Sequence, residues 1–308
     1  MALATPAEFD AATRLDFEIF LERVFAELNP STRFAYNFHI DIIAHKLEQV
    51  RLGNIRRLII NVPPRSLKSI AASVAFPAWV LGHDPTKKVV AISYGQELAD
   101  LLARQCRQVM QQQWYQTLFP ACRLSPTRQA VHDFETTMHG NRIASSVGGA
   151  VTGRGGALVI IDDPIKPDDA RSDIERRRAN EWYRSTLVSR LDDKTVGGIV
   201  LVMQRLHEDD MIGLVLTLDD WEVVSFPAIA QEDEIHVVET PMGRYTHRRA
   251  EGEALHPARE PLYVLESLRR SGVLAYPRSE TTVRFVTHRL IGDAEVERAA
   301  AAVRAAGC

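Results

Sequence analysis

The sequence predicts an α/β fold in which a mostly parallel central sheet is flanked by helices. Short apolar runs rich in β-branched residues alternate along the chain with longer segments of helical periodicity. Runs that are apolar at successive positions are typical of parallel strands buried on both faces. Two of them, at residues 58–62 and 158–161, are each followed by charged side chains, which indicates a candidate site at one edge of the sheet.

The N-terminal part of the chain begins with two helices. Apolar residues recur at helical spacing over residues 16–28 and 38–50, and turn residues follow each segment. The elements predicted next are a strand at 58–62, a helix at 70–81, a strand at 87–94 and a helix at 96–110.

The alternation continues through the middle of the chain. Residues 136–146 are predicted to form a hairpin with its turn at 139–141. The elements predicted after it are a glycine-rich loop at 148–156, a strand at 157–161, a charged helix at 172–190 and a buried strand at 198–203. After about residue 230 apolar strands become sparse, so we expect acidic, loop-like chain there.

The composition is that of a soluble globular protein. The 308 residues are 45% hydrophobic and 25% charged, and the formal net charge is −3. A DNA partner would therefore need a local basic patch, because no global positive field exists. The three cysteines show no metal-ligand spacing. No apolar run has membrane-spanning length and the N-terminus lacks a signal-peptide pattern, so we expect a cytoplasmic protein without membrane contact.

A candidate phosphate-binding loop follows the strand at 58–62. The layout of strand, tight loop, Lys68-Ser69 and helix is that of a loop whose backbone N–H groups cradle phosphates. Lys68 suits the outer phosphates and the Ser69 hydroxyl suits Mg²⁺. In the spacing G-x-x-x-x-G-K-[ST], however, the glycine positions fall on Val62 and Leu67. The residues predicted to line the nucleotide are Pro64, Arg65, Ser66, Leu67, Lys68 and Ser69, and a plain strand-to-helix turn is the alternative.

Two acids at the end of the strand at 157–161 supply the second half of a nucleotide site. Asp162 is predicted to hold Mg²⁺ through water, and Asp163 to polarise the attacking water. A buried strand ends in carboxylates where its edge opens on a site, because a buried unpaired charge is costly. The alternative is an ordinary strand exit with Asp as turn residues before Pro164.

Three further polar residues are candidates for sensing the γ-phosphate or stabilising transition-state charge. Arg154, on the glycine-rich loop, is a candidate arginine finger acting in its own subunit or a neighbour, and Arg65 is a second candidate. Gln204 follows the strand at 198–203, where such a group would sense the γ-phosphate. A solvated loop Arg154, and Gln204-Arg205 capping the next helix, are the alternatives.

Two segments have competing interpretations. Phe38 is a candidate for stacking on a nucleotide base, with core packing at a helix start as the alternative. Residues 207–210 (HEDD) resemble a metal cluster, but four consecutive residues do not face one point on a helix. We therefore expect residues 207–210 to form a solvated helix face and cap.

Together these stretches resemble the ATPase domain of a bacteriophage terminase large subunit, the DNA-packaging motor. The resembling segments include HIDIIAHKLEQV, RLIINVPPRSLKS, AISYGQELAD, WYQTLFP, SSVGGAVTGRGGALVIIDDPIKPDDARSD and VMQRLHEDDMIG, within about residues 35–270. In that family PPR-x-x-KS replaces the glycine-rich loop, and Pro63 and Pro64 stiffen it. The resemblance implies an additional-strand, RecA-like P-loop NTPase that uses ATP and Mg²⁺.

The resemblance also implies partners and a division of the chain. Its partners would be double-stranded DNA, the portal protein and the terminase small subunit, with a homo-oligomeric ring packaging DNA into a procapsid in the host cytoplasm. The expected parts are an N-terminal helical segment (1–34), the P-loop ATPase domain (35–230), a segment leading to a nuclease domain (231–270) and a divergent tail (271–308). The tail is too short for the family's nuclease domain, so we expect no nuclease activity in this chain.

Two other functions stay open from the sequence. One is a catalytically impaired prophage remnant, and the other is a different P-loop nucleic-acid translocase such as a helicase. If DNA binds, we expect contact through the Arg-rich helix at 171–190, with a salt dependence set by phosphate contacts. That helix also carries acids, so a self-paired solvated face is the alternative.

Overall fold

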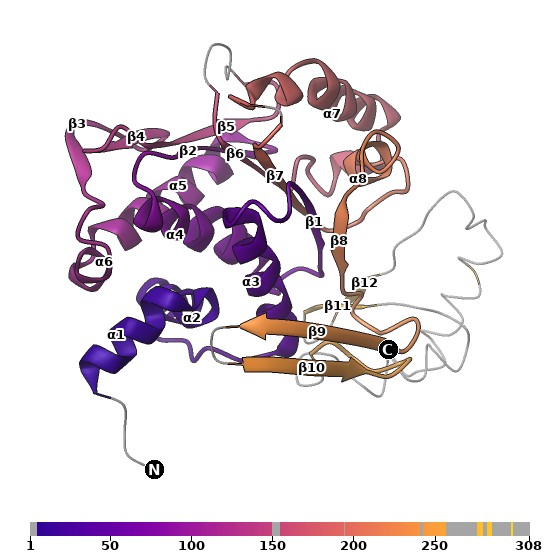
Figure 1. Ribbon diagram of the computed structural model, residues 1–308. Helices are drawn as coiled ribbons and strands as arrows, with labels where there is room; N and C mark the ends of the chain where they lie inside the picture. Colours follow the sequence, from indigo (N-terminus) through magenta and orange to yellow (C-terminus); the bar gives the residue numbers. More distant parts are fainter. Residues whose placement is uncertain are drawn as a thin grey trace.

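An eight-stranded, mostly parallel sheet forms the centre of the computed structural model (Figure 1), which describes residues 5–149, 155–193, 195–240, 243–256, 276–279, 282–284 and residue 297. The strand order is β3-β4-β5-β2-β6-β7-β1-β8. Its strands are β1 (Arg57–Asn61), β2 (Lys88–Ser93), β3 (Leu124–Ala130), β4 (Asp133–Thr136), β5 (Asn141–Ser146), β6 (Leu158–Asp162), β7 (Gly198–Met203) and β8 (Glu222–Ser225). Pairing is antiparallel only in β3-β4 and β4-β5, so the predicted fold class is confirmed.

One strand, β7, lies between the two strands that carry the predicted site. It pairs in parallel with β1 on one side and with β6 on the other. Val200, for example, is in register with Leu58 of β1 and Ile160 of β6. The carboxyl ends of β1 and β6 therefore open on the same edge of the sheet, where ligands bind in α/β proteins.

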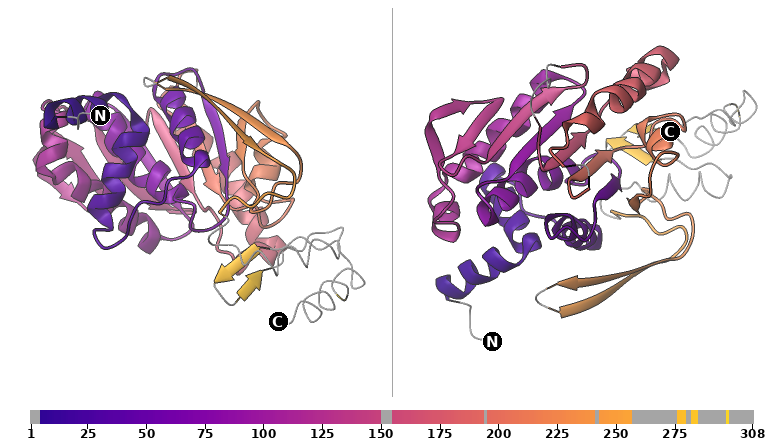
Figure 2. Two further views of the ribbon diagram at one scale, coloured as in Figure 1. Left: turned by 90° about the horizontal axis from the view of Figure 1, so that it is seen from below. Right: turned by 45° about the horizontal axis from the view of Figure 1, so that its top comes forward.

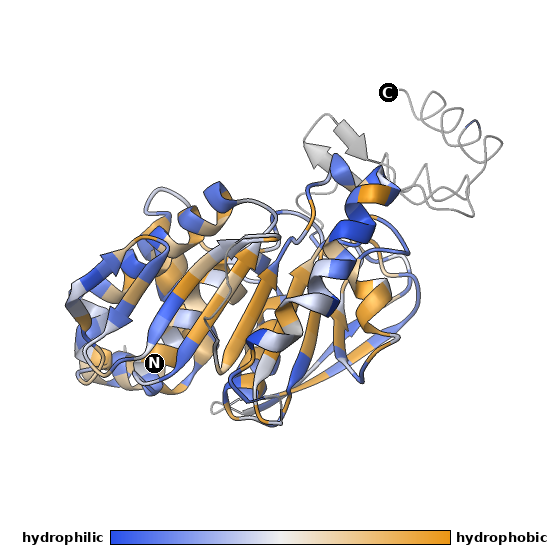
Figure 3. Ribbon diagram, turned by 90° about the horizontal axis from the view of Figure 1, so that it is seen from above, coloured by the Kyte–Doolittle hydropathy of each residue, from blue (hydrophilic) through white to orange (hydrophobic). Residues whose placement is uncertain are grey.

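Helices cover both faces of the sheet (Figure 2). One layer contains α1 (Pro6–Leu15), α2 (Phe17–Leu28), α3 (Phe38–Arg51), the π-helical turn η1 (Ile70–Ala75), α4 (Phe76–His83), α5 (Gln96–Gln111) and α6 (Gln113–Leu118). The other contains α7 (Asp173–Ser185) and α8 (Met211–Val215). In Figure 3 the central strands are largely hydrophobic, whereas α7 above them is mostly hydrophilic.

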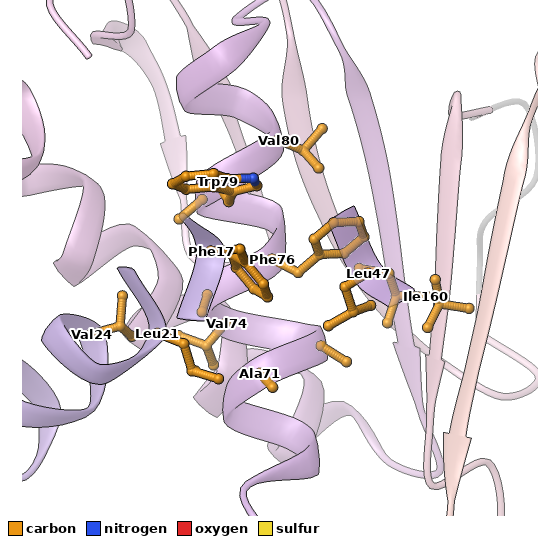
Figure 4. Close-up of a cluster of buried hydrophobic side chains, with 14 of the residues drawn as sticks. Phe17, Leu21, Val24, Leu47, Ala71, Val74, Phe76, Trp79, Val80 and Ile160 are labelled. Carbon is orange, nitrogen blue, oxygen red and sulfur yellow. The ribbon is translucent and has the colours of Figure 1, made fainter. Parts of the chain in front are cut away.

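Successive residues of the central strands pack alternately into two separate hydrophobic cores. Leu58 and Ile60 of β1 pack into the core under α2 to α5, and Ile59 packs into the core under α7 and α8. Figure 4 shows Phe17 of α2 and Phe76 and Trp79 of α4 meeting in the larger core. Successive side chains of a strand point to opposite faces, so a strand buried on both sides must be apolar throughout.

Several elements differ from the sequence prediction, each for a local reason. The helix at 70–81 is divided into η1 and α4, and the charged helix ends at Ser185 before the short 3-10 helix η3 (Leu187–Arg190). The predicted hairpin is confirmed as β4 and β5, with His139 at φ 66° in its turn. The edge strands β3 and β8 give little sequence signal, because most of their residues are solvent-facing.

The region expected to be loop-like after residue 230 contains an antiparallel hairpin. It consists of β9 (Glu234–Thr240) and β10 (Gly243–Arg249), and it packs its inner face against α3. Arg249 is fully buried and donates 2.9 Å to Glu234 across the base of the hairpin. Further along, β11 (Tyr276–Ser279) and β12 (Thr282–Arg284) pair with each other. The rest of the predicted tail lies outside the described residues, so its prediction is untested.

A group of acidic side chains lies at the start of α2, and one of them, Glu18, has a raised pKa. The pKa of Glu18 is raised to about 8, mainly by burial, with smaller contributions from the charge and hydrogen bond of Asp41 and from the charge of Asp16. The Tyr36 hydroxyl donates to Asp41, and His247 of the hairpin lies 3.0 Å from the same carboxylate. The acidic group therefore joins α2, α3 and the hairpin.

Replacing Glu18 with glutamine is expected to stabilise the protein at pH 8 and to have little effect at pH 4.5. The carboxyl has an ordinary pKa near 4.5 when unfolded, so the folded state retains a proton that the unfolded state releases between these values. Wild-type stability from this group is present below pH 4.5 and is lost as the pH rises towards 8. Because Glu18 is partly exposed, we expect a gain of about 1–2 kcal/mol at pH 8. Urea unfolding at both pH values measures the gain, with Glu181→Gln, an exposed glutamate of α7, as the matched control. An equal gain at both pH values would contradict the expectation.

Candidate nucleotide site

The candidate site lies where β1 and β6 end, at the carboxyl edge of the sheet. The loop after β1 runs from Val62 to Ser69 and enters η1. His39, fully buried on α3, contacts the Ser66 carbonyl at 3.3 Å, which ties the loop to the helix layer. The loop is therefore held from below by α3 and continued by a helix.

The loop backbone takes a conformation that normally favours glycine. Arg65 and Leu67 have φ values of 61° and 60°, in the left-handed region. Left-handed residues in a tight loop are typical of concavities in which backbone N–H groups bind anions. Leu67 pairs this backbone with a partly buried side chain that packs on the larger core. Apolar burial thus offsets the backbone strain at the position where the common motif has glycine.

Replacing Leu67 with glycine is expected to leave the protein about 1 kcal/mol more stable than replacing it with alanine. Both variants lose the contact with the core, but only glycine removes the clash of Cβ with the left-handed backbone. At Leu102, buried inside α5, the order should be reversed, because glycine is the poorer residue in a helix. Free energies of unfolding of the four variants test this, and an alanine variant as stable as the glycine variant at position 67 would refute it.

Lys68 forms a close ion pair with Asp163. Its Nζ lies 2.6 Å from Oδ1, and the Lys68 side chain is only 9% exposed. Asp163 is fixed between strands, since its N–H donates to the Val202 carbonyl and its own carbonyl accepts from Tyr94. Its φ of 48° is left-handed, which turns the chain sharply after β6. The pair joins the end of β1 to the end of β6, as the sequence predicts.

Asp162 is buried and held by two hydroxyl groups. Ser69 Oγ donates to Oδ1 at 3.0 Å, and Ser73 Oγ donates to Oδ2 at 2.7 Å. Burial raises the pKa of Asp162 to about 6, and the charge of Asp163 raises it too, whereas Lys68 and the two serines lower it. Ionised Asp162 is therefore electrostatically disfavoured in this site, and a nearby cation would favour it.

The oxygen atoms at Asp162 and Ser69 fit Mg²⁺. This ion prefers hard oxygen donors and binds through one or two carboxylates while keeping several waters. Among the described residues, no group of three or more His, Cys, Asp or Glu side chains is placed to hold a metal ion. A magnesium ion here would thus be held by Ser69, Asp162, water and the phosphates of a nucleotide.

The other predicted residues have different positions. The Gln204 N–H donates to Asp163 Oδ1 at 3.4 Å, so this residue lies at the site. Arg205 instead braces the following turn, with its Nε 2.9 Å from Asp210, and Asp210 caps α8. The predicted cap within residues 207–210 is therefore confirmed, but the predicted solvated helix face is wrong, because these residues form the turn before α8 and Asp210 is buried. Arg65 is exposed on the loop, and Arg154 lies outside the described residues.

Phe38 stands at the start of α3 among aromatic side chains of this chain. Its ring contacts Phe226 edge-on at 5.5 Å and lies nearly parallel to His236 at 6.4 Å. It also packs against the larger core. Its role in base stacking is untested and remains a prediction.

The hydroxyl of Ser73 lies at the site and was not predicted from the sequence. Ser73 follows Ser69 by four residues, and this spacing places two side chains on one face of a helix. Helical spacing from Ser69 was therefore the signal that would have identified it.

Within the described ranges, no helix has the length and apolar character needed to cross a membrane.

Comparison with known proteins adds the following. No protein-family model matches this chain, and no curated protein matches it. Similar solved structures include the large terminase of bacteriophage HK97 (14% identity, TM-score 0.41, covering 70% of this chain and 45% of that one). They also include the large terminase ATPase domain of Thermus phage P74-26 (15%, 0.36, 51% and 64%) and the large terminase of a thermophilic bacteriophage in complex with ADP (10%, 0.35, 59% and 44%). The chain thus spans about half to two thirds of the length of these structures.

Proposed function

We propose that this chain is a terminase large subunit-like ATPase that couples hydrolysis of Mg-ATP to the packaging of double-stranded viral DNA into a procapsid. The observation that carries the proposal is the convergence of Lys68 and Ser69 from one strand end with Asp162 and Asp163 from another. An ammonium, a hydroxyl and two carboxylates in contact are the groups that phosphoryl transfer requires. The strand between them and the left-handed loop support the same function.

Each residue then has a distinct task. The loop backbone at residues 64–67 binds phosphate oxygens, and Lys68 moves from Asp163 to the outer phosphates. Ser69 and Asp162 would hold Mg²⁺, which would neutralise charge on the phosphates. Asp163, released by Lys68, orients the attacking water, and Gln204 beside it senses the γ-phosphate. Arg65 and Arg154 are the candidates for stabilising transition-state charge.

The proposed partners follow from the resemblance to terminases. They are double-stranded DNA, the portal protein and the small subunit, with a ring of identical subunits acting in the host cytoplasm. For DNA, the exposed arginines of α7 are the local basic patch that a chain of net charge −3 needs. Arg178 lies 3.8 Å from Glu175, and its side chain is 72% exposed. An exposed ion pair of this kind contributes little to stability, so Arg178 can leave Glu175 for a DNA phosphate at little cost in free energy.

The proposal is tested by measuring ATP hydrolysis by the purified chain with Mg²⁺, in the presence and absence of linear duplex DNA. Turnover that DNA stimulates is the expected result. Turnover that DNA leaves unchanged would point to another P-loop ATPase and reject the packaging function. No turnover and no nucleotide binding would favour the impaired remnant.

Replacing Arg177 and Arg178 together with alanine is expected to raise the DNA concentration for half-maximal stimulation several-fold without changing basal hydrolysis. Each lost phosphate contact should also lower the salt slope of DNA binding by about 1. Both residues are exposed on α7, where Arg177 donates to the Asp173 carbonyl and Arg178 pairs with Glu175 of the same helix. The matched control is Arg104→Ala together with Lys87→Ala, which also removes two exposed positive charges but none on α7. Equal effects of the two changes would show that only overall charge matters.

A further inference from the structure

A fully buried arginine on β5 contacts the helix that follows the loop. Arg142 is 0% exposed, and its Nη2 donates a 3.0 Å hydrogen bond to the backbone carbonyl of Ser73. Within the described part of the chain, its Nε and Nη1 have no hydrogen-bond partner. A buried guanidinium with so few bonds is costly compared with an apolar side chain of similar size. Folding stability alone therefore does not account for an arginine at this position.

The Ser73 carbonyl lacks its usual α-helical donor. Pro77 stands four residues after Ser73 and has no N–H, so the usual α-helical bond to this carbonyl cannot form. The helix widens at the same place into the π-turn η1, in which the Phe76 N–H donates to Ala71 five residues back. π-turns inside helices are frequent at functional sites. Arg142 supplies to Ser73 a donor that Pro77 lacks.

The same serine is a direct support of the candidate metal ligand. Its hydroxyl donates to Asp162 Oδ2 at 2.7 Å, while Ser69 holds the other carboxylate oxygen. A chain of contacts therefore runs from Arg142 through both polar groups of Ser73 to Asp162. Outer contacts of this kind fix the orientation of a metal ligand.

We propose that Arg142 is a positioning residue that fixes Ser73, and through Ser73 the Asp162 carboxylate, in the orientation that binds Mg²⁺. Its hydrogen bond replaces the helical bond that Pro77 removes. The inference rests on the proposed Mg-ATP function and adds to it a residue that touches neither the metal nor the nucleotide.

The test is a double-mutant cycle read out by calorimetric binding of ADP over a series of Mg²⁺ concentrations. Arg142→Met is expected to raise the Mg²⁺ concentration for half-maximal enhancement of ADP binding about tenfold, with metal-free ADP binding unchanged. Pro77→Ala restores an N–H four residues after Ser73, so in that background Arg142→Met should cost several times less. If Arg142→Met alone folds poorly, the Pro77→Ala background still provides an N–H donor for the Ser73 carbonyl, so the effect of Arg142→Met can be measured there.

The matched control is Arg176→Met on α7. Arg176 is also buried, and it donates to the Ala170 carbonyl and pairs with Asp173 of its own helix, so its loss should leave the Mg²⁺ dependence unchanged. Wild-type Mg²⁺ dependence in Arg142→Met, or equal losses in both backgrounds, would overturn the positioning role. A wild-type chain that binds no ADP, or binds it without regard to Mg²⁺, would instead overturn the proposed function.

Discussion

Replacing Lys68 with alanine is expected to lower the rate of ATP hydrolysis about 10²–10³-fold. Lys68 pairs with Asp163 at 2.6 Å, and it lies on the loop that is proposed to bind the phosphates. Charge that develops on the γ-phosphate would lose its fixed ammonium partner. The rate at saturating ATP and linear duplex DNA measures the effect.

The ion pair makes this substitution informative about folding as well. Without Lys68, Asp163 loses its 2.6 Å partner, and the ammonium charge no longer offsets its repulsion of Asp162. Asp163 keeps 31% of its side chain exposed, so water takes over part of the lost interaction and the chain should still fold. Lys87→Ala is the matched control, because Lys87 is half exposed beside Asp84 and does not contact the acids. A Lys68→Ala chain that folds and hydrolyses ATP within a few-fold of wild type would exclude the proposed role.

The meeting of Lys68 with Asp163 was predictable because it depends on topology. Parallel strands bring their carboxyl ends to one edge, so two strands that both end in polar residues indicate a shared site. The left-handed backbone at Leu67 was not predictable, because leucine rarely takes this conformation and only its packing on the core permits it. The role of Arg142 was not predictable either. Its partner is the backbone carbonyl of Ser73, which lacks its usual helical donor because Pro77 has no N–H.

The remaining differences between the predicted and observed elements arise where neighbouring residues in the sequence form no clear apolar pattern. Strand β9 alternates exposed and covered residues, whereas β10 is exposed from Gly243 to Thr246. The covered face of the hairpin carries His236, His247 and Arg249, which do not form an apolar pattern in the sequence. Only the fold reveals that these polar side chains face α3. Conversely, the strands β1, β6 and β7 were found at nearly their observed bounds, because burial on both faces leaves a continuous apolar run.

Replacing Asp162 with asparagine is expected to lower hydrolysis at least about 100-fold while stabilising the fold. The carboxylate is the predicted metal ligand, and a neutral amide binds Mg²⁺ far less well. Yet burial and Asp163 make its charge costly in the metal-free protein, since they raise its pKa from 3.8 to about 6. Stability therefore falls as the pH rises between these values, and above pH 6 the amide should gain about 1–3 kcal/mol.

The opposite signs of these two effects distinguish a functional acid from a structural one. If Asp162 served mainly to receive the hydroxyls of Ser69 and Ser73, asparagine would weaken that arrangement, because its amide nitrogen cannot accept a hydrogen bond. The chain would then lose stability and activity together. Urea unfolding at pH 8 without Mg²⁺, beside hydrolysis rates with Mg²⁺, separates the two outcomes. Activity lost with stability gained would show that this carboxylate is kept, against its cost to folding, for the cation it binds.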